Sequence, residues 1–101
     1  MTTWFVSRHP GALEWAARQG LRIDRFATHL ELSDVQPGDT VIGSLPVNLA
    51  ALVCQRQARF LNLSVQLPFE LRGTELSADQ LEQLSARLEE YSVLNTKGVT
   101  Q

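Results

Sequence analysis

Two polar residues near the N-terminus are suited to chemistry on a phosphate. Arg8 and His9 stand between a short apolar stretch and a Pro-Gly pair. A guanidinium presents a planar fork of N–H donors that matches phosphate oxygens, and an imidazole donates or accepts a proton near neutral pH. The pair therefore favours binding and transfer of a phosphoryl group. The alternative is a surface turn in which Arg8 forms an ion pair with Glu14 or another acid.

A second turn, around Ser44, could supply further contacts to a phosphate. The β-branched residues Val41 and Ile42 favour a buried strand just before it. Gly43 permits a sharp turn or a close approach to a ligand, and Pro46 suits the first position of a helix. The start of such a helix carries free N–H groups and a partial positive charge, which favour an anion. The alternative is that Gly43 and Pro46 only shape the turn.

The elements that must position these turns alternate along the chain. We expect strands over residues 3–7, within 21–32, around 41–42 and over 59–67, and helices over about 10–20, 46–57 and 77–91. The last helix has leucines at three- and four-residue spacing, and Ser77 and Gln80 form a capping box at its start. The alternation predicts an α/β fold, a small sandwich with a mostly parallel sheet. Ligands in such folds bind beyond the carboxyl ends of the strands, so the turns at Arg8 and Ser44 should meet at one edge.

The remaining polar residues give weaker signals. Arg72 and Glu75 flank Gly73 in an irregular stretch, where they could reach the same edge or bind each other. His29 lies in the second expected strand, and a single histidine there is more often structural than catalytic. Two histidines and one cysteine do not make a zinc site, and the sequence has no paired-acid metal motif, P-loop or dinucleotide-binding fingerprint. We therefore expect no metal and no cofactor.

Length and charge limit the classes of partner. The chain has 101 residues, which corresponds to one domain, and we place it at residues 1–94 with a flexible C-terminal tail over 95–101. The formal charge is -2 and the pI is about 5.6, so charge gives no basis for binding duplex DNA. No apolar run is long enough to cross a membrane and no signal peptide is evident, so we expect a cytoplasmic protein.

Three blocks of sequence resemble one known family. They comprise residues 4–12 with Glu14, Trp15 and Ala16, residues 38–50, and residues 72–77. In content and order the blocks are similar to a small CRISPR-associated accessory family, the Csx type numbered sixteen, over nearly the whole chain up to about Tyr91. The chain departs from that pattern at Gln57-Ala58, where a glycine is expected before the strand.

The resemblance implies a ring nuclease of type III CRISPR immunity, which opens a cyclic oligoadenylate second messenger, with cyclic tetra-adenylate as the expected ring. It also implies a homodimer with a Rossmann-like three-layer sandwich, similar to the CRISPR-associated ligand sensors called CARF domains. A ring of RNA carries its own nucleophile, the ribose 2′-hydroxyl, so orientation and charge stabilisation would suffice without a metal. Two alternatives stay open: a sponge that binds the ring without cutting it, and an interaction subunit of a CRISPR complex with no ligand.

This function assigns roles to the polar residues of the two turns. Arg8 would hold the phosphate charge, Ser44 would make a second phosphate contact, and His9 would act as acid or base, so these three form the expected catalytic set. The expected ligand-binding residues are Ser7, Gly11, Gly43, Leu45, Pro46, Asn48, Arg72 and Glu75. Arg8→Ala should impair binding and cleavage, whereas His9→Ala should impair cleavage alone, because a neutral imidazole adds little ground-state affinity.

Overall fold

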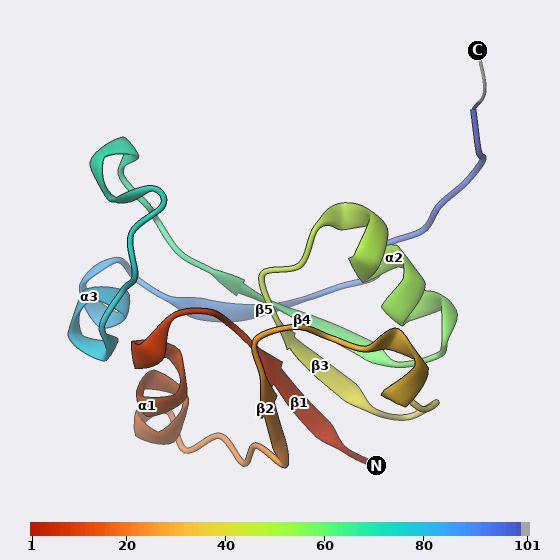
Figure 1. Ribbon diagram of the computed structural model, residues 1–101, viewed down its shortest axis with the longest axis horizontal. Coiled ribbons are helices and arrows are strands. Elements are labelled where there is room, and N and C mark those ends of the chain that lie inside the picture. The colour runs from red at the N-terminus through yellow and green to blue at the C-terminus, as the bar shows by residue number, and fades with distance from the viewer. Residues whose placement is uncertain (100–101) are drawn as a thin grey trace.

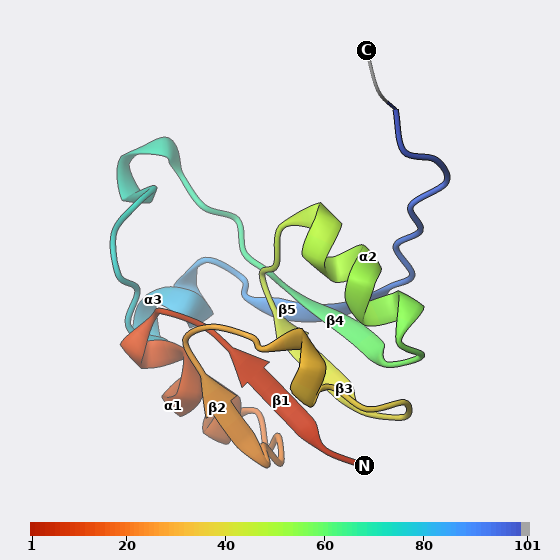
Figure 2. The same ribbon diagram turned by 45° about the vertical axis from the view of Figure 1, so that its right-hand side comes forward.

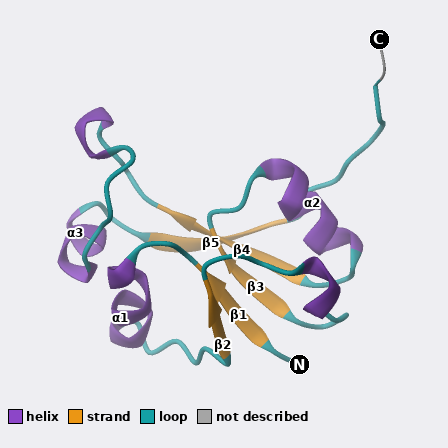
Figure 3. Ribbon diagram, viewed as in Figure 1, coloured by secondary structure: helices purple, strands orange, loops and turns teal. Residues whose placement is uncertain are grey.

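A five-stranded sheet runs through the molecule and carries helices on both faces (Figures 1 and 3). The computed structural model describes residues 1–99. The strands lie in the order β2-β1-β3-β4-β5 and comprise β1 (Thr3–Val6), β2 (Arg25–Ala27), β3 (Thr40–Gly43), β4 (Arg59–Ser64) and β5 (Arg87–Tyr91). The first four strands run parallel to one another, and β5 is antiparallel to β4. The expected α/β fold with a mostly parallel sheet is therefore confirmed.

The helices form the outer layers of a three-layer sandwich, as Figure 1 and the turned view in Figure 2 show. Helices α1 (Pro10–Arg18) and α3 (Ala78–Gln83) cover one face. Helix α2 (Val47–Gln55) covers the other face, together with a short 3-10 turn (Leu32–Asp34). A second 3-10 turn (Phe69–Leu71) lies in the long connection between β4 and α3. These layers agree with the small Rossmann-like sandwich that was expected.

Consecutive residues of β1 and β3 pack into the apolar cores on opposite faces of the sheet. Phe5 and Ile42 pack beneath α1 and α3, in a cluster that includes the buried Trp15. Trp4 and Val41 pack beneath α2 on the other face. Side chains alternate along a strand, so a strand covered on both faces has a continuous apolar run. This property of β1 and β3 made both strands recognisable in the sequence.

Several elements are shorter than the sequence indicated. Within residues 21–32 only Arg25–Ala27 form a strand, β2. Strand β4 ends at Ser64 rather than at residue 67. Pro46 is the N-cap of α2 and not its first residue, and the helix ends at Gln55. Gln57 then adopts a φ of 65°, a conformation that favours glycine. This conformation accounts for the glycine expected at that place.

The helix expected over residues 77–91 is wrong beyond its first turns. The capping box is present, because Gln80 N–H donates to Ser77 Oγ at 3.2 Å and Ser77 N–H donates to Gln80 Oε1 at 2.9 Å. Helix α3 nevertheless ends after six residues, and Ser85, with a φ of 59°, reverses the chain. Residues 87–91 then pair with β4 as β5. This pairing outweighs the helical spacing, because an unpaired β4 would expose a row of backbone groups.

One buried carboxylate ties the N-terminus to the turn before β3. Asp39 is 3% exposed and accepts hydrogen bonds from Thr2 N–H (2.9 Å), Gln36 N–H (2.9 Å) and Trp4 Nε1–H (3.2 Å). Burial by itself raises the pKa of Asp39, but the hydrogen bonds from Gln36, Thr2 and Trp4 outweigh it and lower the pKa below its ordinary value. The ionised form of Asp39 therefore stabilises the fold.

Asp39→Asn should lower the free energy of unfolding at neutral pH by about 1–3 kcal/mol, because an amide has one acceptor oxygen for three donors. Since the pKa of Asp39 is lower in the folded state, the wild type has this stabilisation above the unfolded-state pKa and loses it as the pH falls through the folded-state pKa. The variant should lose less stability over that range. Urea unfolding from neutral to acid pH measures both effects, and equal stability of the two proteins at neutral pH would contradict them.

The C-terminal segment leads away from the sheet (Figure 1). Residues 92–99 form no helix or strand, and residues 100 and 101 of the expected tail lie outside the described residues. The domain limit at residue 94 therefore stays a prediction. Within residues 1–99, no helix has the length and apolar character needed to span a bilayer.

Candidate functional site

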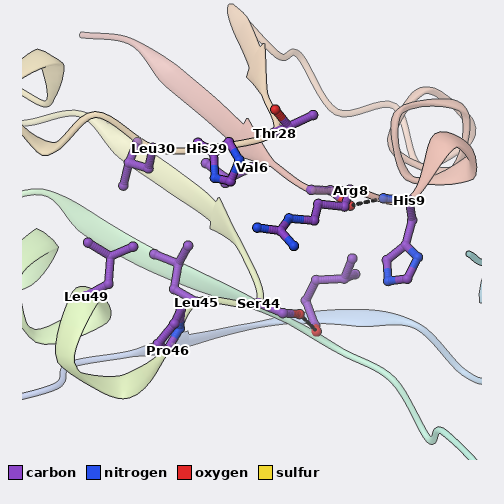
Figure 4. Close-up of a pocket in the computed structure, with 12 residues that line it drawn as sticks. Val6, Arg8, His9, Thr28, His29, Leu30, Ser44, Leu45, Pro46 and Leu49 are labelled. Carbon is purple, nitrogen blue, oxygen red and sulfur yellow. Dashed lines mark hydrogen bonds between the residues drawn. The ribbon is translucent and has the colours of Figure 1, made fainter. Parts of the chain in front are cut away.

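A pocket lies at the edge of the sheet where β1, β2 and β3 end. Its volume is about 410 Å³, and its walls come from the ends of these strands and from the start of α2 (Figure 4). The chain leaves β1 toward β2 and leaves β3 toward β4, which lie in opposite directions along the sheet, so the connections part between β1 and β3. Open α/β sheets bind ligands at such a switch point. The pocket is lined by Val6, Ser7, Arg8, His9, Thr28, His29, Leu30, Ser44, Leu45, Pro46, Leu49 and Leu63.

Arg8 supplies the positive charge of this pocket. It is exposed, and Figure 4 shows its guanidinium extending over the space between the strand ends. Glu14, the acid considered as its partner, instead pairs with Arg18 at 3.6 Å. Among residues 1–99, no carboxylate forms an ion pair with Arg8. The donors of the guanidinium are therefore available to a ligand.

In Figure 4 the Arg8 guanidinium and the His9 ring extend to opposite sides. The His9 ring accepts a hydrogen bond from the backbone of a distant segment. Its Nδ1 accepts the N–H of Leu76 at 3.1 Å, and the Gly11 N–H donates to the Leu76 carbonyl at 3.3 Å. Because Nδ1 uses its lone pair in this bond, the neutral ring carries its proton on Nε2. A proton on Nδ1 would break the bond to Leu76. The acid–base role expected of His9 stays a prediction, and this bond opposes it.

Two substitutions separate the structural role of His9 from proton transfer. In His9→Asn the side-chain oxygen can still accept the Leu76 N–H, but the side chain cannot transfer a proton. His9→Ala leaves that N–H unpaired, which costs about 1–3 kcal/mol. We expect His9→Asn to keep the wild-type melting temperature and His9→Ala to lower it by about 4–8 °C for each kcal/mol. If a stable His9→Asn protein fails to cleave cyclic oligoadenylate and the wild type proves to do so, the imidazole of His9 does transfer a proton.

Two serines at the pocket bond to the backbone. Ser44 donates its hydroxyl proton to the Leu63 carbonyl at 2.9 Å, one residue beyond the last paired residues of β3 and β4. Ser7 Oγ accepts the N–H of His9 at 3.0 Å and shapes the turn after β1. The structure thus places Ser44 where the sequence predicted, beside Arg8. Donation from Ser44 to a phosphate would require it to give up its bond to Leu63.

The start of α2 adds a second source of positive potential. The helix has nine residues, Pro46 is its N-cap, and no side chain caps it. The N–H groups of Val47, Asn48 and Leu49 have no partner within the helix, because the Ala50 N–H is the first to reach back, to the Pro46 carbonyl at 2.9 Å. Pro46 and Leu49 line the pocket, so this helix end can attract an anion there.

Five of the expected ligand-binding residues are not in the lining of this pocket, namely Gly43, which directly precedes Ser44, and four others. Asn48 lines a groove between α2 and residues 93–95, and Arg72 is exposed in the connection before α3. Glu75 and Gly11 line a second cavity of about 410 Å³ beside the start of α1. Within the described part of the chain, Arg72 and Glu75 form no ion pair with each other. The structure therefore brings Ser7, Leu45 and Pro46 to Arg8 and leaves these four apart.

Two glycines of the expected site allow segments to pack closely. A Cβ on Gly43 would lie 2.5 Å from the Val6 carbonyl oxygen, where β3 touches β1. A Cβ on Gly11 would overlap the backbone of Ser77 and Ala78, where α1 touches the start of α3. Only glycine fits such contacts without a shift of the backbone. The packing accounts for both residues without a ligand.

The loop after β2 was not among the expected site residues. Thr28, His29 and Leu30 line the pocket, and His29, expected to be structural, is exposed there. The parallel pairing of β2 with β1 is the reason, because it brings the carboxyl end of β2 to the same edge as Arg8. The strand expected within residues 21–32 was the available signal, because a loop follows the end of any such strand.

The pocket suits an anion that also has an apolar part. The charged or titratable side chains in its lining are Arg8, His9 and His29, and none of the lining residues is a carboxylate. Leucines and Pro46 add apolar surface on which a planar base can pack. Within residues 1–99, no cluster of three or more His, Cys, Asp or Glu side chains could hold a metal ion. A phosphate joined to a nucleoside fits this chemistry better than a free cation does.

The sequence matches a family model over most of its length. The family is described as "Putative CRISPR-associated protein (Cas_VVA1548)", and the match covers residues 4–94, which include the whole pocket lining. Comparison with curated proteins and with solved structures gave no match. The family description states an association with CRISPR systems and no activity.

Proposed function

This chain belongs to the Cas_VVA1548 family of CRISPR-associated proteins, and we propose that it is a ring nuclease, as its resemblance to the Csx type numbered sixteen implies. Its substrate would be a cyclic oligoadenylate, with cyclic tetra-adenylate preferred, and its role the removal of this second messenger in type III CRISPR immunity. The supporting observation is the Arg8 guanidinium, which has no ion pair among residues 1–99, in a pocket without carboxylates at the switch point of the sheet. Such a site fits a phosphodiester.

The proposed reaction runs without a metal. The ribose 2′-oxygen attacks the adjacent phosphorus, and the bond from phosphorus to the 5′-oxygen breaks. The ring opens with a 2′,3′-cyclic phosphate at one end and a 5′-hydroxyl at the other. Arg8 binds the non-bridging oxygens and stabilises the charge that develops on them. The start of α2 adds its dipole, and the walls of the pocket hold the attacking and leaving oxygens in line.

A homodimer would suit this substrate. A cyclic oligoadenylate repeats its phosphates around a ring, whereas each chain has one copy of the pocket that contains Arg8. Two subunits related by a two-fold axis would present two copies of Arg8 to one ring. Light scattering should give the mass of a dimer, and a monomer both with and without bound ring would remove this part of the proposal.

A second function, sequestration of the ring without cleavage, is favoured by the bond between Nδ1 of His9 and Leu76. That bond leaves the neutral His9 ring without a lone pair for the 2′-hydroxyl proton. Binding through Arg8 needs no such group. A protein of this kind would lower the concentration of free messenger and leave it chemically intact.

Incubation of the purified protein with labelled cyclic tri-, tetra- and hexa-adenylate in EDTA separates the two functions. Chromatography should show conversion of the preferred ring to linear products that end in a cyclic phosphate. A ring that is bound tightly but recovered whole would support sequestration. Failure to bind or cut any of the three rings would reject both functions.

A further inference from the structure

The loop after β2 places a second histidine beside Arg8. Strands β1 and β2 pair in parallel, with Val6 opposite Ala27 at their carboxyl ends. The Ser7 N–H continues this pairing by donating to the Ala27 carbonyl at 3.0 Å. Arg8 and His29 both stand two residues beyond this last pair. They therefore leave the sheet side by side, from strands whose usual spacing is about 4.8 Å.

Within residues 1–99, the His29 ring has no hydrogen-bond partner, whereas the His9 ring accepts a hydrogen bond. The His29 side chain is exposed at the pocket, and within residues 1–99 its imidazole forms no hydrogen bond. It can therefore present a lone pair to a bound molecule. In Figure 4 it lies on the side toward which the Arg8 guanidinium extends, whereas the His9 ring lies on the other side. Nδ1 of His9 is bonded to Leu76.

We infer that His29 is the proton acceptor in ring opening, an inference that rests on the proposed function. A ring nitrogen of His29 takes the proton of the ribose 2′-hydroxyl while the 2′-oxygen forms its bond to phosphorus. The bond between phosphorus and the 5′-oxygen breaks, and that oxygen takes up a proton from solvent. The imidazolium then releases its proton to solvent, so no co-reactant is consumed. Arg8, which follows β1, binds the phosphate oxygens, and His29, in the loop after β2, acts on the sugar.

His29→Ala tests this inference. We expect the single-turnover rate with cyclic tetra-adenylate in EDTA to fall about 100- to 10,000-fold, as for loss of a general base. The dissociation constant should stay near that of wild type, because Arg8 and the start of α2 remain. Added imidazole should restore part of the rate, since the vacated position is open to solvent, and should not accelerate the wild-type protein. The melting temperature should not change, because the His29 side chain is exposed.

Other outcomes would overturn the inference. A His29→Ala protein that cleaves at the wild-type rate would remove His29 as the proton acceptor and leave the ring nuclease in place. So would a slow variant that imidazole does not rescue, or one whose defect lies wholly in binding. If the wild-type protein cuts none of the cyclic oligoadenylates, both the proposed function and this inference are rejected.

Discussion

Arg8→Ala is expected to slow ring opening about 100- to 1,000-fold and to weaken binding of the ring. The Arg8 side chain is exposed and forms no ion pair among residues 1–99, so its removal takes a charged donor from the pocket without disturbing a core. Its hydrogen bonds strengthen as the phosphate oxygens gain charge in the transition state, so the rate should fall more than the affinity. Single-turnover rates and dissociation constants in EDTA measure the two effects separately.

Two further variants make this test specific to the guanidinium. Arg8→Lys keeps the charge but loses the planar fork, so its rate should lie between those of wild type and Arg8→Ala. Arg22→Ala removes the same charge at the opposite end of the strands. Arg22 lies before the start of β2, whereas the pocket lies beyond the end of β2. This control should keep the wild-type rate and affinity. An equal loss in Arg22→Ala would attribute the effect to net charge, and full activity in Arg8→Ala would reject the site.

The position of the pocket could be predicted because it follows from local sequence. Aromatic and β-branched runs mark β1 and β3, and a polar turn follows each of them. Once these strands are taken as parallel neighbours, their carboxyl ends meet, and Arg8 and Ser44 meet with them. The structure confirms this meeting, since both residues line one pocket.

Hydrogen bonds between distant segments could not be predicted in this way. Nothing near His9 indicates that the N–H of Leu76, 67 residues later, donates to its ring. The hydrogen bond that the Ser44 hydroxyl donates likewise depends on a carbonyl of another strand, that of Leu63. Periodicity was ambiguous as well, because Leu88 fits the spacing of a helix and also packs against the core from β5. Pairing with β4 favours the strand over the helix for these residues, and β4 offers its unpaired backbone groups only once the sheet has assembled.

Gly11→Ala is expected to destabilise the fold strongly. Gly11 is buried, a Cβ at this position would overlap backbone atoms of Ser77 and Ala78, and the Gly11 N–H donates to the Leu76 carbonyl at 3.3 Å. Backbone atoms cannot rotate out of the way as the end of a flexible side chain can. To relieve the overlap, α1 and the start of α3 would have to move apart. Such overpacking costs about 1–3 kcal/mol and occasionally more. Each kcal/mol lowers the melting temperature of a domain of this size by about 4–8 °C.

Gly98→Ala is the matched control, because a Cβ at Gly98 meets nothing within 4 Å. Thermal unfolding should show a large fall in melting temperature for Gly11→Ala and none for Gly98→Ala. If Gly11 instead contacts the ligand, as the sequence indicated, Gly11→Ala would keep the wild-type melting temperature and lose affinity for the ring. That result would move the binding site toward the cavity beside α1. Loss of stability would instead show that packing of α1 on α3 accounts for Gly11, and the pocket of Arg8 would stay the candidate site.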